Sequence, residues 1–180
     1  MIEAVYLRRA EVPDIDMIAA MWTRSSQWLA KHGFDQWQYP VKMHNITRTV
    51  KAGSVWIADV DGGRPAGMLT VDTDAEPRYW KLDNPADALY AHRMVTERWA
   101  SGFELGSALL DWAGRRAAAD GRSWLRLDAW RSNTSLHHYY LARGFELVRI
   151  VADDPADPSG ACFQRGAKVQ SELGPKVIEQ

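Results

Sequence analysis

The sequence contains one cysteine and no excess of charge of either sign. Cys162 alone cannot form a disulfide within the chain or a cysteine metal cluster, so we expect a reducing, cytoplasmic setting and no bound metal. Lys and Arg number 22 against 23 Asp and Glu, which gives a formal net charge of −1. This balance gives no general reason to expect nucleic acid or an anionic membrane as a partner.

The sequence also lacks a long apolar run near its start. Residues 1–12 carry Glu3, Arg8 and Arg9, so we expect neither a signal peptide nor a membrane span there. The 180 residues are 46% hydrophobic, which is enough for one ordinary domain with a core. We expect a single domain over residues 1–166 and a flexible tail over 167–180.

The first half of the chain predicts two helices and a hairpin. A strand over residues 2–9 precedes a helix that Pro13 opens and Gly33 ends, with Ile15, Ile18, Trp22 and Leu29 on one stripe. A shorter helix follows over 41–52. Residues 54–60 and 65–72 form a hairpin because Gly62 and Gly63 supply the positive φ of a tight turn. Residues 74–88 contain two prolines and several charges, and we expect an exposed loop there.

The second half alternates strands with helices. Strands are predicted over 88–95, 123–130, 145–151 and 161–165, and helices over 102–120 and from 134, the latter capped by Asn133 or Ser132. This alternation predicts an α/β chain whose successive strands pair in parallel through crossover helices.

A turn between the strand over 88–95 and the following helix carries the main chemical signal. Gly102 and Gly106 bracket it, and the first amides of a helix can hold a phosphate without help from side chains. The same two glycines also suit a plain helix entry. From these residues alone, both interpretations stay open.

Three segments together resemble the GNAT superfamily of acyl-CoA-dependent N-acyltransferases, and the resemblance covers nearly the whole chain: "AKHGFDQWQYP", "HRMVTERWASGFELGSALLDWA" and "LRLDAWRSNTSLHHYYLARGFE". It implies a mixed α+β three-layer sandwich, with helices on both faces of a mixed six- to seven-stranded sheet whose central parallel strands splay apart. It also implies transfer of an acetyl group from acetyl-CoA to the amine of a small molecule.

The resemblance further implies which residues bind the cosubstrate. Backbone groups of the strand would meet the pantetheine, amides of the turn would meet the pyrophosphate, and the side chain of Asn133 would reach the pantetheine, although Asn133 also suits a helix cap. The cosubstrate residues are Met94, Val95, Thr96, Gly102, Phe103, Glu104, Leu105, Gly106, Ser107 and Asn133.

Tyr140 matches the family tyrosine that protonates the departing thiolate. A donor of high pKa suits this step because charge develops first on the carbonyl oxygen and then on sulfur. Tyr139 and Tyr140 are also ordinary packing residues by type. For the base that accepts the proton of the ammonium substrate, the candidates are Tyr90, His92 and Asp128, although Asp128 also suits pairing with an arginine or amide and strand histidines are often structural.

The acceptor side is expected near the loop after the first helix. The resemblance places Asp35, Gln36 and Trp37 beside the substrate amine, with Trp37 as an apolar wall and Asp35 as the partner of a cation. Trp80, in the long loop, would close over them, and Asp128 belongs to the same substrate side. We expect a monomer or homodimer, with no nucleic acid and no membrane as partner.

The turn departs from the family pattern at two named positions, where Trp99 replaces Gln or Arg and Glu104 replaces Gly or Ala. Like charges about 4 Å apart repel by roughly 1 kcal/mol in water and about 4 kcal/mol at a dielectric near 20. Affinity for a diphosphate would then fall about tenfold to a thousandfold.

Two outcomes follow for Glu104. It can turn to solvent or support the helix dipole while the amides still bind CoA. Alternatively the pyrophosphate site is lost, and the chain acts as a carrier-protein-dependent acyltransferase, a CoA-independent lyase or cyclase with Glu104 as acid or base, or a ligand-binding module.

Overall fold

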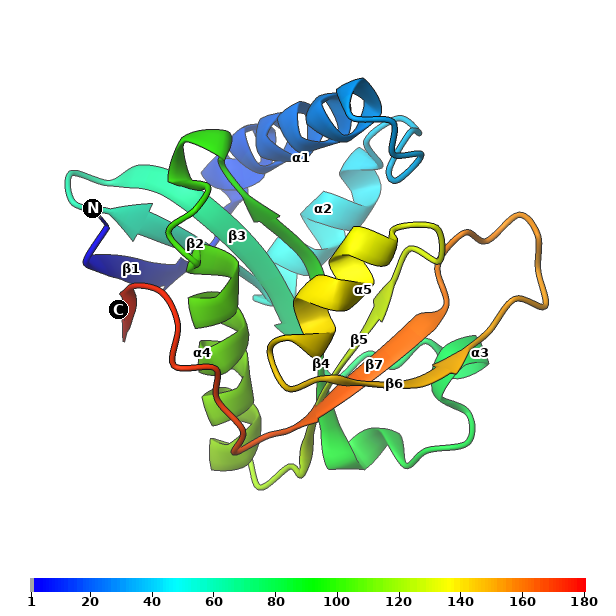
Figure 1. The fold of residues 1–180 in the computed structure, drawn as a ribbon. Helices are drawn as coiled ribbons and strands as arrows, with labels where there is room; N and C mark the ends of the chain where they lie inside the picture. Colours follow the sequence, from blue (N-terminus) through cyan, green and yellow to red (C-terminus); the bar gives the residue numbers. More distant parts are fainter. Residues whose placement is uncertain (1) are drawn as a thin grey trace. The chain divides into compact units, whose positions relative to one another are not determined.

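The computed structural model describes residues 2–180, and its strands form a mixed sheet in the order β6-β7-β5-β4-β3-β2-β1-β8 (Figure 1). The strands are β1 (Ala4–Arg9), β2 (Val55–Val60), β3 (Arg64–Asp72), β4 (Ala88–Thr96), β5 (Trp124–Ala129), β6 (Glu146–Ile150), β7 (Ala161–Gly166) and β8 (Lys176–Glu179). The helices are α1 (Ile15–Lys31), α2 (Met43–Lys51), α3 (Pro77–Trp80), α4 (Leu105–Ala119) and α5 (Thr134–Leu141). The mixed α+β fold class is confirmed.

The chain divides into two compact units. The first contains the residues up to Val71 together with Arg93–Leu109 and Glu172–Gln180, and the second contains Asp72–His92 and Leu110–Ser171.

In the first unit, β2 lies antiparallel to β1 and to β3, while β8 runs parallel to β1. The apolar stripe of α1 packs with α2 on residues of β2 and β3, and Ile18, Met21 and Trp22 are buried in this cluster. The hairpin turn has φ of 83° at Gly62 and 75° at Gly63, which left-handed glycines supply without strain.

In the second unit, β5 pairs in parallel with β4, and β7 lies antiparallel to both β5 and β6. The expected parallel pairing of β4 with β5 is therefore confirmed. A direct pairing of β5 with β6 is wrong, because β7 lies between them. The core of this unit contains Tyr79, Trp80, Tyr90 and Cys162.

Two expectations about irregular segments are wrong. Residues 74–88 contain α3, whose Tyr79 and Trp80 are buried, so this segment is not simply an exposed loop. Residues 167–180 are not an unstructured tail, since Lys176–Glu179 forms β8 on β1 and brings the sheet to eight strands rather than six or seven. Within residues 2–180, no helix has the length and apolar character needed to cross a membrane.

Candidate functional site

The turn predicted to bind phosphate leads directly into helix α4. The short 3₁₀ helix η3 (Arg98–Ala100) follows β4, and Gly102 has a φ of 85°. The amide of Ala108 donates to the carbonyl of Glu104 at 3.1 Å, so Glu104 directly precedes the first residue of α4, Leu105. Leu105, Gly106 and Ser107 therefore form the first turn of α4, where the helix dipole is positive.

Glu104 lies on this first turn rather than in open solvent. Its side chain is half-buried, and the Ser107 hydroxyl donates to its Oε2 at 2.6 Å. Its φ is 55°, a left-handed conformation that a residue with a Cβ adopts only at a cost. Sequence reasoning did not foresee the Ser107 contact, although Ser107 follows Glu104 by three residues, a spacing that brings side chains together on a helix. A carboxylate at the start of a helix interacts favourably with the helix dipole, and it lies where the GNAT resemblance implies a diphosphate.

The segment before β8 packs directly against this turn. A Cβ added to Gly174, whose φ is 89°, would lie 2.3 Å from the Glu104 carbonyl oxygen. Only glycine permits this close approach. The backbone of the turn is thus held from both sides, by α4 and by residues 172–180.

The central parallel pairing is short. It joins Ala88–Tyr90 to Trp124–Arg126, although β5 continues to Ala129 and β4 to Thr96. Arg93 interrupts β4 with a φ of 48°. Beyond this point Val95 is buried, while Met94 and Thr96 are half-buried.

Tyr140 is buried on α5 among aromatic rings. The centroids of Tyr139, Phe145 and Phe163 lie 5.5–5.6 Å from that of Tyr140. Burial raises the pKa of the Tyr140 phenol above its ordinary value, so the group stays protonated at neutral pH. Asn133 begins the same helix, and its Oδ1 accepts from the Leu136 amide at 3.0 Å. The predicted cap is therefore present.

His92 forms a pair with Asp72, a residue that sequence reasoning missed. Nε2 of His92 lies 3.0 Å from Oδ1 of Asp72, and the same oxygen accepts from the Asp74 amide at 2.9 Å. Because an ionised carboxylate only accepts, the Nε2 atom carries the proton and Nδ1 is left as the basic nitrogen. The two residues are 20 positions apart, and only the fold brings them together.

Asp128 and Tyr90 have different surroundings. Burial raises the pKa of the Asp128 carboxyl, while the charge of His92 and a hydrogen bond from Ser159 oppose the shift. Tyr90 is buried, and its hydroxyl accepts from Arg126 at 3.2 Å. Tyr90 is therefore a packing residue, whereas Asp128 lies within electrostatic reach of His92.

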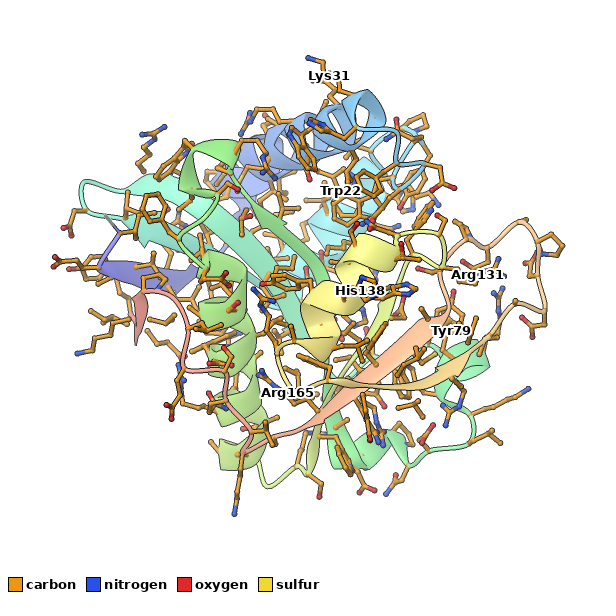
Figure 2. The ribbon with its side chains drawn as sticks, viewed as in Figure 1. Trp22, Lys31, Tyr79, Arg131, His138 and Arg165 are labelled. Atoms are coloured by element: carbon orange, nitrogen blue, oxygen red, sulfur yellow. The ribbon has the colours of Figure 1, made fainter. Side chains whose placement is uncertain are left out.

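An ionic network adjoins Asp128 in the second unit. The Tyr79 hydroxyl and the Arg78 guanidinium both donate to the Asp157 carboxylate, and Arg131 donates to the Asp157 carbonyl at 2.6 Å. Tyr79 and Arg131 are labelled in Figure 2. Burial and the Asp157 contact raise the pKa of the Tyr79 phenol. Asp157 also contributes to the raised pKa of Asp128.

The residues expected to bind the acceptor differ in their burial and contacts. Asp35 is exposed, Gln36 is buried, and Trp37 packs against Trp22 with ring centroids 4.6 Å apart and the rings tilted by 34°. The role of Trp80 as a cover over the substrate is wrong. Its side chain is only 2% exposed and packs in the core, where guanidinium groups of Arg126 and Arg149 lie 5.2 and 5.6 Å from its ring.

In residues 2–180, no three or more His, Cys, Asp or Glu side chains are grouped so as to hold a metal ion. The helix start after β4 and the buried tyrosine on the helix after β5 are features that the resemblance to the GNAT class implies.

Comparison with known proteins agrees with this class. No family model matches the chain. It is 26% identical over 151 residues to the uncharacterized N-acetyltransferase YesJ of Bacillus subtilis, covering 81% of this chain and 84% of that protein. A GNAT-family acetyltransferase structure from Listeria monocytogenes superposes with a TM-score of 0.73 at 23% identity, covering 90% of this chain and 94% of that one.

A structure of N-acetylglutamate synthase from Neisseria gonorrhoeae, complexed with coenzyme A and N-acetylglutamate, has a TM-score of 0.62 at 19% identity. It covers 91% of this chain and 35% of that one. The solved structures share the fold, and the curated relative is an N-acetyltransferase. The GNAT resemblance and the enzyme class expected from the sequence are thus confirmed.

Proposed function

We propose that the protein transfers an acetyl group from acetyl-CoA to the amine of a small molecule. The observation that carries this proposal is the start of α4, a glycine-bracketed helix entry that follows β4 through the short helix η3. The amides of residues 102–107 hold the diphosphate, and the backbone of Met94–Thr96 meets the pantetheine. The Neisseria relative with bound coenzyme A supports this choice of cosubstrate.

Tyr140 acts as the general acid. The neutral amine attacks the thioester carbon, a C–N bond forms, the C–S bond breaks, and the phenol gives its proton to the departing thiolate of CoA. The proton that the attacking nitrogen then loses returns to the phenolate, so that the amide forms and the Tyr140 phenol is restored. The raised pKa of Tyr140 favours the protonated phenol that this step requires. Burial among three aromatic rings also fixes the orientation of the phenol ring.

His92 acts as the proton acceptor for the ammonium form of the substrate. Asp72 fixes the tautomer by accepting from Nε2, which leaves Nδ1 to take the proton. The Asp74 amide in turn fixes the Asp72 carboxylate. Asp72 is a positioning residue, because it acts through the imidazole.

A second candidate function rests on one observation. The Glu104 carboxylate bonds Ser107 at the first turn of α4, where a diphosphate would lie. A protein that no longer uses CoA would explain this arrangement, and would act as a carrier-protein-dependent acyltransferase, a CoA-independent lyase or cyclase, or a ligand-binding module.

Calorimetric titration with acetyl-CoA separates the two candidates. The first predicts saturable binding, and release of free CoA thiol that requires both enzyme and an added amine. A reaction without amine controls for hydrolysis. No binding at millimolar acetyl-CoA would overturn the first candidate and favour the second.

A further inference from the structure

The end of the chain packs directly on the backbone at the start of α4. A Cβ added to Gly174 would lie 2.3 Å from the carbonyl oxygen of Glu104, 2.9 Å from its carbonyl carbon and 3.1 Å from Cβ of Ala108. Two backbones approach this closely only where one of them carries no side chain. Residues 172–180, which belong to the same compact unit as Glu104 and Ala108, are called the strap.

Strand β8 fixes the strap to β1. The Lys176 amide donates to the Glu3 carbonyl at 2.9 Å, next to the parallel pairing of the two strands. Pro175 is buried and joins this strand to Gly174, and its ring restricts the backbone of both residues. The position of Gly174 is therefore fixed from the side of the sheet.

The residue before the strap is bonded to α4. The Ser171 amide donates to both carboxylate oxygens of Asp111 at 3.0 Å, and the Ser171 hydroxyl donates to Oδ2 at the same distance. Gly174 thus lies between two anchored points of the chain. It has little freedom to move away from Glu104.

Glu104 has a backbone conformation that a glutamate does not adopt without support. Its φ of 55° lies in the left-handed region that favours glycine. Such a conformation persists where the surrounding structure fixes it. The Glu104 carbonyl accepts from the Ala108 amide at 3.1 Å and is covered by Gly174, so the helix and the strap fix it together.

This conformation determines where the first amides of α4 point. A left-handed residue beside right-handed ones turns successive amides toward a common point, which forms a concave site for an anion. Both Gly102 and Glu104 have a positive φ at this turn. A change of Glu104 to the right-handed conformation would rotate the peptide that joins it to Leu105 and remove this arrangement.

We propose that the strap positions the start of α4 for binding the diphosphate of acetyl-CoA, and that Gly174 is the positioning residue, acting through the backbone of Glu104. This role rests on the proposed binding of acetyl-CoA. The strap gives no group to the ligand. It keeps the turn preformed, so that binding does not have to reorder the backbone.

Gly174→Ala tests the contact itself. The added Cβ forces the strap away from the Glu104 carbonyl, and we expect the Kd for acetyl-CoA to rise about tenfold in calorimetric titration, equivalent to ~1.4 kcal/mol. Gly121→Ala is the matched control, because Gly121 has a φ of 73° but a Cβ there would meet nothing within 4 Å. A Kd for Gly174→Ala equal to that of the wild type would overturn the proposal.

Lys176→Pro loosens the strap without adding a side chain at Gly174. It removes the amide that donates to Glu3, whereas Lys176→Ala keeps this amide and shortens only the side chain. We expect Lys176→Pro to raise the Kd for acetyl-CoA about fivefold or more, and Lys176→Ala to change it less than about twofold. The same Kd in both variants would contradict the role of the strap.

A second background separates positioning from a general loss of structure. Glycine adopts the left-handed conformation without support, so the Glu104→Gly protein depends less on the strap. Gly174→Ala should therefore raise the Kd less than about threefold in this background. An undiminished tenfold rise would show that Gly174 does not act through the conformation of residue 104.

Hydrogen exchange tests the strap in the absence of any ligand. The Ala108 amide, which donates to the Glu104 carbonyl, should exchange faster in Gly174→Ala and Lys176→Pro than in the wild type and Lys176→Ala. Unchanged exchange at Ala108 would overturn the strap. Failure of the wild type to bind acetyl-CoA, with this pattern of exchange intact, would overturn only the proposed function.

Discussion

We expect the hydroxyl group of Tyr140 to have a large effect on the rate of acetyl transfer. Tyr140→Phe removes the proton donor and keeps the ring packed against Phe145 and Phe163. We expect kcat to fall by about 10²–10³-fold, within the usual range for loss of a general acid, with the KM for acetyl-CoA little changed. Steady-state kinetics with release of CoA thiol measures this. Tyr139→Phe is the control, and similar losses in both variants would contradict the assigned role.

We expect Asp72 to affect catalysis only through its hydrogen bond with His92. Asp72→Asn weakens the contact that fixes the His92 tautomer, so we expect kcat to fall about tenfold to a hundredfold, with a smaller change in KM.

A double-mutant cycle distinguishes positioning from a merely structural role. If Asp72 acts through the imidazole, adding Asp72→Asn to His92→Ala produces no further loss of kcat. Additive losses would show that Asp72 does not act by positioning His92.

At the scale of elements, the start of α4 combines a strained backbone with an unfavourable charge for binding a diphosphate. Glu104→Gly removes the carboxylate and allows the φ of 55° without a Cβ. We expect the Kd for acetyl-CoA to fall by about tenfold or more, which corresponds to ~1.4 kcal/mol. Calorimetric titration gives the value directly.

Glu172 offers a matched control, because it is also a glutamate with a positive φ, of 58°. Glu172→Gly should relieve similar backbone strain without changing the Kd for acetyl-CoA. An unchanged or higher Kd in Glu104→Gly would show that the carboxylate does not oppose CoA binding.

The elements best predicted from the sequence are those with strong local signals. The helix ending before Gly121 and the hairpin through Gly62 and Gly63 follow from periodicity and turn residues, and both are present. Strand β8 was missed because four residues carry almost no periodicity. Trp80 was misplaced because two prolines and several charges suggested exposure, while its burial depends on contacts with distant Tyr90 and Arg126.

The candidate site shows the same contrast between local and long-range signals. The Asn133 cap follows from its position before a helix and is present, while the roles of Tyr140 and of the turn at Gly102 follow from the family resemblance and stay predictions. The pair of His92 with Asp72 could not be predicted, since it joins residues from different strands. The packing of Gly174 against Glu104 likewise exists only in three dimensions.

At the scale of the whole molecule, each compact unit needs its own stabilising interactions, and the second contains a buried ion pair. Arg165 is a residue of β7 (Figure 2), and its Nη1 donates to Oδ1 of Asp111 on α4 at 3.0 Å. Burial lowers the pKa of the Arg165 guanidinium, and the charge of Asp111 opposes this shift. Asp111 also accepts from the amide and hydroxyl of Ser171.

Arg165→Met should lower the free energy of unfolding by about 3–5 kcal/mol, because it leaves a buried carboxylate without its cation. The Arg165→Met/Asp111→Leu variant should recover part of this loss. Urea denaturation measures both. Arg24→Met is the control, since Arg24 is 51% exposed in its pair with Glu97 and such pairs contribute about 1 kcal/mol or less. A loss in Arg165→Met no larger than in Arg24→Met would refute the importance of the buried pair.

Strand β8 has a consequence beyond the fold of a single copy. Without it, β1 would end the sheet and present a bare row of amides and carbonyls beside the buried side chains of Val5 and Leu7. An exposed edge strand of this kind can pair with strands of other molecules. The last strand is only four residues long and has exposed charges at Lys176 and Glu179, so it guards the molecule against edge-to-edge aggregation.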